Sequence, residues 1–452
     1  MSSATDSALS PKPGYATLSP EAERGVGRLQ IAAYSLGHVL NDMAAAVWFS
    51  YLLLYLQEAE GLSGTQAGAV MFAGQLADAL ATPLVGIASD ASAGCLGLGR
   101  RKAWNAAGVA IVALNFGLMF GSVLPGSLGA GGKAAALGLF AALFNVGWAA
   151  VQVSHMALVP ELTRSEGMRV VLNSARYALT VLSNCAVFLT VLGLVGLQAG
   201  PTTESSPRYR DPALYTSLSH AVLGAGLGAS ALFLLFCREP TRKQLAAAAA
   251  AGEAREAAAA AAEGEAEAEE GGSRAEQLLG SADAGAGGAG LQDKPRRGSG
   301  ERGAHYAVGT WRDWLRVPDF WRIMGVYTLV RLSVNISQVY LTFFVTEALR
   351  MEQTAVALTP LLLYVAQLGS TLASRRVAVR LGRRRAIGLG SLLTVAACVA
   401  MGSIQQGSST WLIYPSVVLL GVGLALNMVI CASSATPRRH SARKAARPRP
   451  TL

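Results

Sequence analysis

The sequence predicts an all-α polytopic membrane protein, with about ten transmembrane helices in two bundles, the second of them truncated. Three observations support this prediction. Of the 452 residues, 52% are hydrophobic and only 15% are charged, whereas ordinary soluble domains carry about 25% charged residues. Apolar runs long enough to cross a bilayer recur along the chain. Basic residues gather beside alternate runs, as the positive-inside rule predicts.

A helix rises 1.5 Å per residue, so about 20 apolar residues cross the hydrocarbon core of a bilayer. Each apolar run is about that long or longer. In chain order, the runs that predict helices fall near 31–57, 66–89, 103–124, 134–158, 170–197, 213–237, 319–348, 355–374, 386–404 and 411–431. The first holds His38 and Asp42 in its middle, and the second holds Asp78. Charge inside a bilayer is costly and usually faces a protein interior or a water-filled path. These residues therefore predict a transporter cavity. The alternatives are a solvated helix end for Asp42 and a bond to a neighbouring helix for Asp78.

The runs divide the chain into five predicted parts. These are a disordered cytosolic tail at 1–30, a six-helix bundle at 31–237, a cytosolic low-complexity linker at 238–318, an incomplete bundle at 319–431 and a basic tail at 432–452. Arginine and lysine placement predicts that the linker and both termini lie in the cytosol.

Several classes of function are disfavoured. The net charge of +10 does not indicate a nucleic-acid partner, because the basic residues cluster beside apolar runs. The 5 cysteines show no metal-ligand spacing and no disulfide framework. The sequence contains no Gly-rich phosphate loop and no nucleophile elbow. We therefore expect neither an enzyme nor a cofactor. The expected partners are a small-molecule solute and the lipid bilayer, and a coupling proton is a further candidate.

The two halves read as repeats. The segment 34–38 matches 327–331, and at the same offset Asp42 falls opposite Asn335. A glycine followed by three basic residues comes after the second run of each half, at 99–102 and at 382–385. Parallel repeats related by an axis normal to the membrane are a known way of building transporters.

These motifs are similar to those of the major facilitator superfamily. One segment resembles the cytoplasmic-loop motif of that superfamily, although its spacer is longer. Its residues are Gly86, Asp90, Gly99, Arg100, Arg101 and Lys102. The run from Asp78 through Thr82 to Gly86 looks like a motif of the glycoside–pentoside–hexuronide:cation symporter branch. Segments 37–42, 48–56, 101–104, 147–155 and 331–338 resemble branch members that import cysteine into lysosomes and melanosomes. The resemblance implies the major facilitator fold, secondary transport by alternating access and a lysosomal or melanosomal membrane.

The departures from the branch bear on the solute. Where the branch has the second acid of its cation site, this chain has Thr82. Where the branch has the aspartate and the stacking aromatic residue of its sugar site, this chain has Gln152 and Met156. A cation-coupled sugar symporter is therefore the alternative to a transporter of a zwitterion. Arg176 and Arg331 suit a carboxylate, which arginine binds bidentately. A salt bridge to Asp42 or Asp78 is an equally weighted role for Arg176. Cysteine as the solute comes from the resemblance alone.

The histidines have two readings as well. His155 and Gln152 lie within one helical turn, where polar residues often bond neighbouring helices. His38 titrates near neutrality and is suited to sense an acidic lumen. The predicted substrate or coupling residues are His38, Asp42, Asp78, Thr82, Gln152, His155, Arg176, Arg331 and Asn335.

The sequence changes character after Cys431, where a Pro-rich basic tail begins that cannot span a bilayer. The family resemblance implies two further helices there, so we expect a truncated product. The alternative is a natural ten-helix protein whose tail binds the membrane surface. A non-transporting membrane product is therefore a second class of function.

Overall fold

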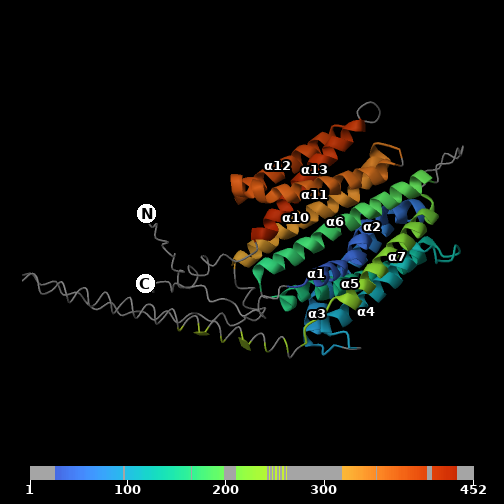
Figure 1. Cartoon of the computed structure of the whole chain (residues 1–452). Helices are drawn as coiled ribbons and strands as arrows, with labels where there is room; N and C mark the ends of the chain where they lie inside the picture. The colour runs from blue at the N-terminus through green and yellow to red at the C-terminus, as the bar shows by residue number, and fades with distance from the viewer. Residues whose placement is uncertain are drawn as a thin grey trace, which may run out of the picture. The chain divides into compact units, whose positions relative to one another are not determined.

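The computed structural model describes residues 26–94, 97–163, 165–197, 210–241, 318–352, 354–404 and 410–434, with scattered residues between 244 and 261. In these ranges the regular secondary structure is helical throughout (Figure 1). Most of the predicted tail at 1–30, of the linker at 238–318 and of the tail at 432–452 lies outside the described residues.

The predicted all-α membrane fold is confirmed. Within the described ranges, 9 helices are long and apolar enough to cross a membrane, and a shorter apolar helix runs over Ala355–Thr371. The first half contains α1 (Arg28–Leu36), α2 (Val39–Leu54), η1 (Tyr55–Ala59), α3 (Gly64–Ala91), α4 (Arg100–Phe120), α5 (Ala130–Leu162), α6 (Glu166–Leu197) and α7 (Pro212–Phe236). The second contains α10 (Pro318–Phe343), η3 (Phe344–Ala348), α11 (Ala355–Leu381), α12 (Arg383–Gly402), η4 (Thr410–Leu412) and α13 (Ile413–Ser434).

Local sequence explains where several helices begin. Ser63 and Gln66 form a reciprocal capping box at the start of α3, which satisfies amide groups that the first turn leaves unbonded. Asp211 caps α7, and Pro212 occupies its first turn, where a missing amide hydrogen costs nothing. Polar capping chemistry thus ends the loops and starts the apolar spans.

By packing, the chain divides into two compact units. The first comprises Met1–Glu239, Gln338–Val365 and Gln405–Trp411, and the second comprises Pro240–Ser337, Ala366–Ile404 and Leu412–Leu452. In the first unit, α3 and α4 both pack along α5. Its core contains large, fully buried rings, among them Trp48, Phe116 and Phe144. In the second unit, α12 packs along α13. The predicted bundle boundaries stay predictions.

Paired glycines support the internal repeat. A β-carbon added to Gly108 of α4 would lie 2.8 Å from the carbonyl oxygen of Gly147 on α5. In the second unit, a β-carbon added to Gly423 of α13 would lie 2.8 Å from the carbonyl oxygen of Gly390 on α12. Small residues let membrane helices approach closely. The same pair of helices therefore crosses at glycines in each half.

Two further features recur. The first span ends in the π-turn η1, where the Glu60 amide donates to the Tyr55 carbonyl oxygen at 3.0 Å. Its counterpart η3 closes with the Leu349 amide donating to the Phe344 carbonyl oxygen at 2.9 Å. Gly99 and Gly382, which precede α4 and α12, adopt φ angles of +91° and +76°. Only glycine adopts such angles readily, so the matching glycine-basic segments have a shared backbone reason.

Candidate solute-binding site

The first membrane span is interrupted, although its apolar sequence predicts one continuous helix over 31–57. Helix α1 ends at Leu36 and α2 begins at Val39, with Gly37 and His38 in the turn between them. A β-carbon added to Gly37 would lie 2.7 Å from ring carbons of both His155 and Phe233. The break is therefore packed against α5 and α7 and needs a glycine. Discontinuous helices in transporters commonly carry the groups that bind solutes.

His38 and Asp42 meet just after this break. His38 Nδ1 lies 2.9 Å from Asp42 Oδ1, an ion-pair distance, although the two groups are not aligned as a hydrogen bond. Both side chains are buried. Thr180 of α6 donates its hydroxyl hydrogen to Asp42 Oδ2 at 2.8 Å. Asp42 is therefore enclosed by protein and is not a solvated helix end.

His155 of α5 joins this group from the other side. Its side chain is fully buried, and its Nε2 lies 2.7 Å from the Tyr34 carbonyl oxygen. Its ring stacks on the ring of Tyr34 at a centroid distance of 4.3 Å and lies 5.6 Å from the ring of His38. Three predicted residues, His38, Asp42 and His155, are thus brought together by the helix break, α2 and α5.

Arg176 lies on α6, one turn before Thr180, and lies close enough to Tyr34 and His155 to act on both electrostatically. Its side chain is half-buried, and its Nε is enclosed without a hydrogen-bond partner. No carboxylate in the described part of the chain forms an ion pair with it, so the alternative of a salt bridge to Asp42 or Asp78 is not present. We call His38, Asp42, His155, Arg176 and Thr180 the inner cluster.

The other predicted site residues lie elsewhere. The Thr82 hydroxyl on α3 donates to Asp78 Oδ1 at 3.2 Å. The side chains of Thr82 and Gln152 are exposed. Arg331 and Asn335 lie on α10 within the second unit, where Arg331 is exposed and Asn335 is half-buried. Their roles stay predictions.

The cytoplasmic-loop motif forms a connected set of charges. Arg101 pairs with Asp90, and its Nε donates to Glu161 Oε1 at 2.9 Å. Arg100 Nη2 lies 2.6 Å from the same Glu161 oxygen. Gly99 supplies the left-handed backbone already described, whereas Gly86 takes no part beyond its carbonyl oxygen, which accepts from Ser89 at 3.1 Å.

Glu239 completes this set from the end of the first unit. Its two carboxylate oxygens accept the amide hydrogens of Arg100, Arg101 and Lys102 at 2.8–2.9 Å. A carboxylate at a helix N-terminus is stabilised both by these amides and by the helix dipole. Lys102 Nζ donates to the Cys237 carbonyl oxygen at 2.8 Å. We call Asp90, Arg100, Arg101, Lys102, Glu161 and Glu239 the loop network.

The sequence alone does not predict Glu161 and Glu239 as members of this network. Glu161 has a weak signal, because it lies in the segment 158–162 that resembles the symporter branch. Glu239 has only its place directly after the sixth apolar run. Neither position shows which basic residues it contacts.

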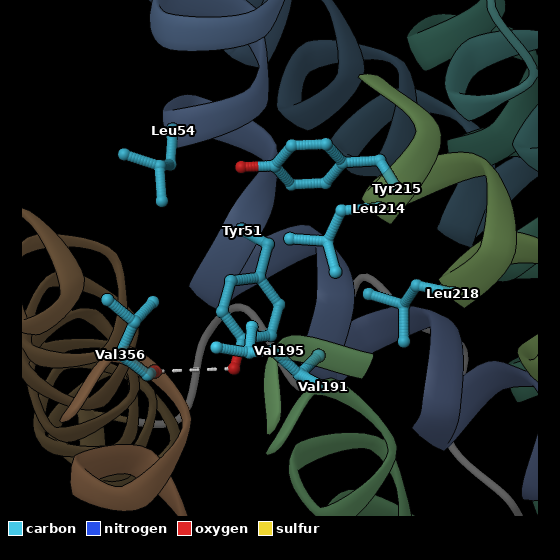
Figure 2. Close-up of a pocket in the computed structure, with 8 residues that line it drawn as sticks. All are labelled: Tyr51, Leu54, Val191, Val195, Leu214, Tyr215, Leu218 and Val356. Atoms are coloured by element: carbon cyan, nitrogen blue, oxygen red, sulfur yellow. Dashed lines mark hydrogen bonds between the residues drawn. The ribbon is translucent and has the colours of Figure 1, made fainter. Parts of the chain in front are cut away.

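A small pocket in the first unit is a separate candidate. It is lined by Tyr51, Leu54, Val191, Val195, Leu214, Tyr215, Leu218 and Val356 (Figure 2). The Tyr51 hydroxyl donates to the Val356 carbonyl oxygen at 3.3 Å. The lining is aliphatic apart from two tyrosines and offers no charge, so we do not assign a zwitterion to it. Among the described residues, no group of three or more His, Cys, Asp or Glu side chains is placed to hold a metal ion.

Comparisons with known proteins agree with the helical architecture. The family described as MFS/sugar transport protein matches residues 33–259, and Major Facilitator Superfamily matches residues 212–447. The chain is 32% identical over 439 residues to Major facilitator superfamily domain-containing protein 12 of Equus caballus, covering 93% of this chain and 81% of the relative. The protein of that name from Homo sapiens is 31% identical over 432 residues, with coverages of 93% and 80%.

Solved structures show the same fold at low sequence identity. The nucleoside transporter NupG aligns with a TM-score of 0.58 at 11% identity, covering 90% of this chain and 82% of that one. A bacterial homolog of the human lysosomal transporter Spinster, in an inward-facing conformation, aligns with a TM-score of 0.57 at 13% identity, covering 93% and 78%. With these matches over most of its length, the chain belongs to the major facilitator superfamily, whose members are transporters in the membrane.

Proposed function

We propose that this protein is a secondary transporter that moves a small zwitterionic amino acid, cysteine, across a lysosomal or melanosomal membrane by alternating access. The observation that carries the proposal is Arg176, a half-buried arginine without a carboxylate partner among the described residues. Buried charges in proteins are ordinarily paired, because an unpaired one is costly. A guanidinium left open beside a helix break is suited to bind a solute carboxylate bidentately.

The ammonium group of a zwitterion needs an acid. Asp42 contacts His38 and Thr180 within the inner cluster. Asp78 accepts a hydrogen bond from Thr82 and lies in the run 78–86 that resembles the motif of the symporter branch. On this resemblance we assign the ammonium group to Asp78. The roles of Arg331 and Asn335 stay predictions from the sequence.

The resemblance of the sequence supports cysteine and the organelle, the relatives support the family, and the charge placement supports the orientation. The quoted segments resemble branch members that import cysteine into lysosomes and melanosomes. Over 93% of this chain, 31–32% of the aligned residues are identical to those of the two relatives named Major facilitator superfamily domain-containing protein 12. Basic residues follow the even-numbered spans, which places the linker and both termini on the cytosolic side in our proposal.

A cation-coupled sugar symporter is the second candidate, favoured by the match to the family described as MFS/sugar transport protein. Against it stand Thr82 and Gln152, where the branch pattern has acids, and Met156, where the pattern has an aromatic ring. Sugar sites rely on carboxylates and on a stacking platform, and these positions supply neither.

Competition during uptake separates the two candidates. Labelled cysteine uptake is measured in vesicles containing the full chain. The competitors are unlabelled cysteine and three other unlabelled compounds. Cysteamine lacks the carboxylate, 3-mercaptopropionate lacks the ammonium group, and xylose represents the sugars. We expect unlabelled cysteine to compete and all three to fail, because Arg176 and Asp78 are both engaged only by a zwitterion. Competition by xylose, or cysteine uptake no greater than in empty vesicles, would overturn the proposal.

A further inference from the structure

Two imidazole rings lie together inside the first unit. His38 comes from the break between α1 and α2, and His155 comes from α5. Their centroids are 5.6 Å apart, and their side chains are almost entirely buried, with exposed fractions of 6% and 0% for the residues. Rings at this separation are close enough for a proton on one to be felt by the other.

Each ring has one nitrogen with no polar partner, and His38 Nδ1 also forms no aligned hydrogen bond with Asp42. The Tyr34 carbonyl only accepts, so His155 Nε2 carries the hydrogen and Nδ1 keeps a lone pair. That Nδ1 has no hydrogen-bond partner. His38 places Nδ1 beside Asp42, and its Nε2 has no partner. A buried polar atom without a partner costs about 1–3 kcal/mol, so two in adjacent rings call for a functional explanation.

The charges around the rings are few and unequal. Asp42 faces His38 from α2, and Thr180 of α6 binds the other oxygen of that carboxylate. On the His155 side, α1 contributes Tyr34, α7 contributes the uncharged ring of Phe233, and α6 contributes the positive charge of Arg176. A proton on His38 is thus paired with an acid, whereas a proton on His155 is not. The surroundings therefore place a negative counter-charge beside His38 and a positive charge on the His155 side.

We propose that His38 and His155, with Asp42 as counter-ion, form the site that binds the coupling proton of this transporter. The proposal rests on the proposed function and deepens it, because it separates the proton site from the group that binds the solute. The proton resides on His38 against Asp42, and His155 accepts or returns it through its unused Nδ1. The remaining candidates for solute contact, Arg176 and Asp78, are left outside this exchange.

Coupling follows from the position of Arg176. Arg176 lies one turn before Thr180 on α6, whose hydroxyl lies 2.8 Å from Asp42 Oδ2 and 3.2 Å from the backbone carbonyl oxygen of Arg176. With the proton bound, His38 compensates Asp42, and Arg176 is available to the solute carboxylate. When the proton leaves, the charge of Asp42 is no longer compensated, which changes the electrostatic environment of Arg176. Proton binding and solute binding are therefore coupled.

Two transport assays on the full chain in liposomes separate coupling from transport. The first is cysteine counterflow without a pH gradient, and the second is uptake driven by a pH gradient. The variants are His38→Gln and His155→Gln, in which glutamine keeps an amide donor but binds no proton. The matched control is His220→Gln, an exposed histidine on α7. We expect gradient-driven accumulation by the first two to fall by about tenfold or more relative to their own counterflow, within the usual range for coupling between sites, while the control keeps the wild-type ratio.

Gradient-driven accumulation equal to wild type in both variants would overturn the proton site while leaving the proposed function intact. If wild type shows no cysteine counterflow, the proposed function fails, and the proton site is then tested without solute. Nitrogen-15 spectra of imidazole-labelled protein follow each histidine during a pH titration. We expect His38→Gln to shift the titration of His155, and a titration of His155 that is indifferent to this change would contradict the proposal.

Discussion

The loop network and the inner cluster both contain charged side chains, but they differ in how many of the polar atoms have hydrogen-bond partners. In the loop network each charged side chain contacts a partner, although one oxygen of Glu161 is enclosed without one. Arg101 binds Asp90 and Glu161, and Glu239 binds three backbone amides. In the inner cluster, nitrogens of His38, His155 and Arg176 are enclosed without hydrogen-bond partners. Satisfied polar networks rigidify a fold, and unsatisfied ones are costly to keep. The difference indicates that the first region holds the helices and the second binds something that comes and goes.

Removing a paired charge from the loop network should have the largest effect on stability. We expect Arg101→Gln to destabilise the protein by about 1.5–3 kcal/mol, because Glu161 loses one of its two arginine partners and the charge-assisted hydrogen bond to it. The residue is 7% exposed. Arg384, two residues after Gly382, occupies the matching place in the second repeat and is exposed. We expect Arg384→Gln to change stability by less than about 0.5 kcal/mol. Thermal unfolding in detergent measures both, and equal losses would contradict the distinction.

A change at the helix break should have a smaller effect that reaches the inner cluster. In Gly37→Ala, the new methyl group would meet the rings of His155 and Phe233 at 2.7 Å. Such overpacking costs about 1–3 kcal/mol and displaces the His155 ring. Gly224→Ala on α7 is the control, because no heavy atom lies within 4 Å of its added β-carbon. The unfolding temperatures of the two variants are compared, and a Gly37→Ala protein as stable as Gly224→Ala would contradict the close packing described here.

Much of the fold is predictable from sequence because it depends on local composition. Apolar runs of bilayer length place the helices within a few residues of their observed ends. Gly99 and Gly382, each followed by basic residues, predict a shared turn and helix start, and both have positive φ angles. Bringing His38 and Asp42 to one face also follows from their spacing of four residues.

What the sequence does not predict depends on partners far along the chain. The break at Gly37 lies in an apolar run with no proline, where rings from α5 and α7 leave no room for a β-carbon. Thr180 reads as one more residue of an apolar helix until α6 places it against Asp42. Glu239 caps a helix that begins 139 residues earlier in the chain. A contact of this kind leaves no periodic or local pattern, so only the packed fold shows it.

The state of Arg176 tests the central claim most directly. Binding of labelled cysteine to purified protein is measured for wild type, Arg176→Lys and Arg176→Gln, with the unfolding temperature of each. Lysine keeps the charge but loses the bidentate geometry, and glutamine loses both. We expect binding to weaken in the lysine variant and to weaken further, by about 2–5 kcal/mol in all, in the glutamine variant. Because Arg176 has no carboxylate partner among the described residues, we expect all three unfolding temperatures to agree. Unchanged cysteine binding in Arg176→Gln, or a loss of binding that follows a loss of folded protein, would contradict the claim.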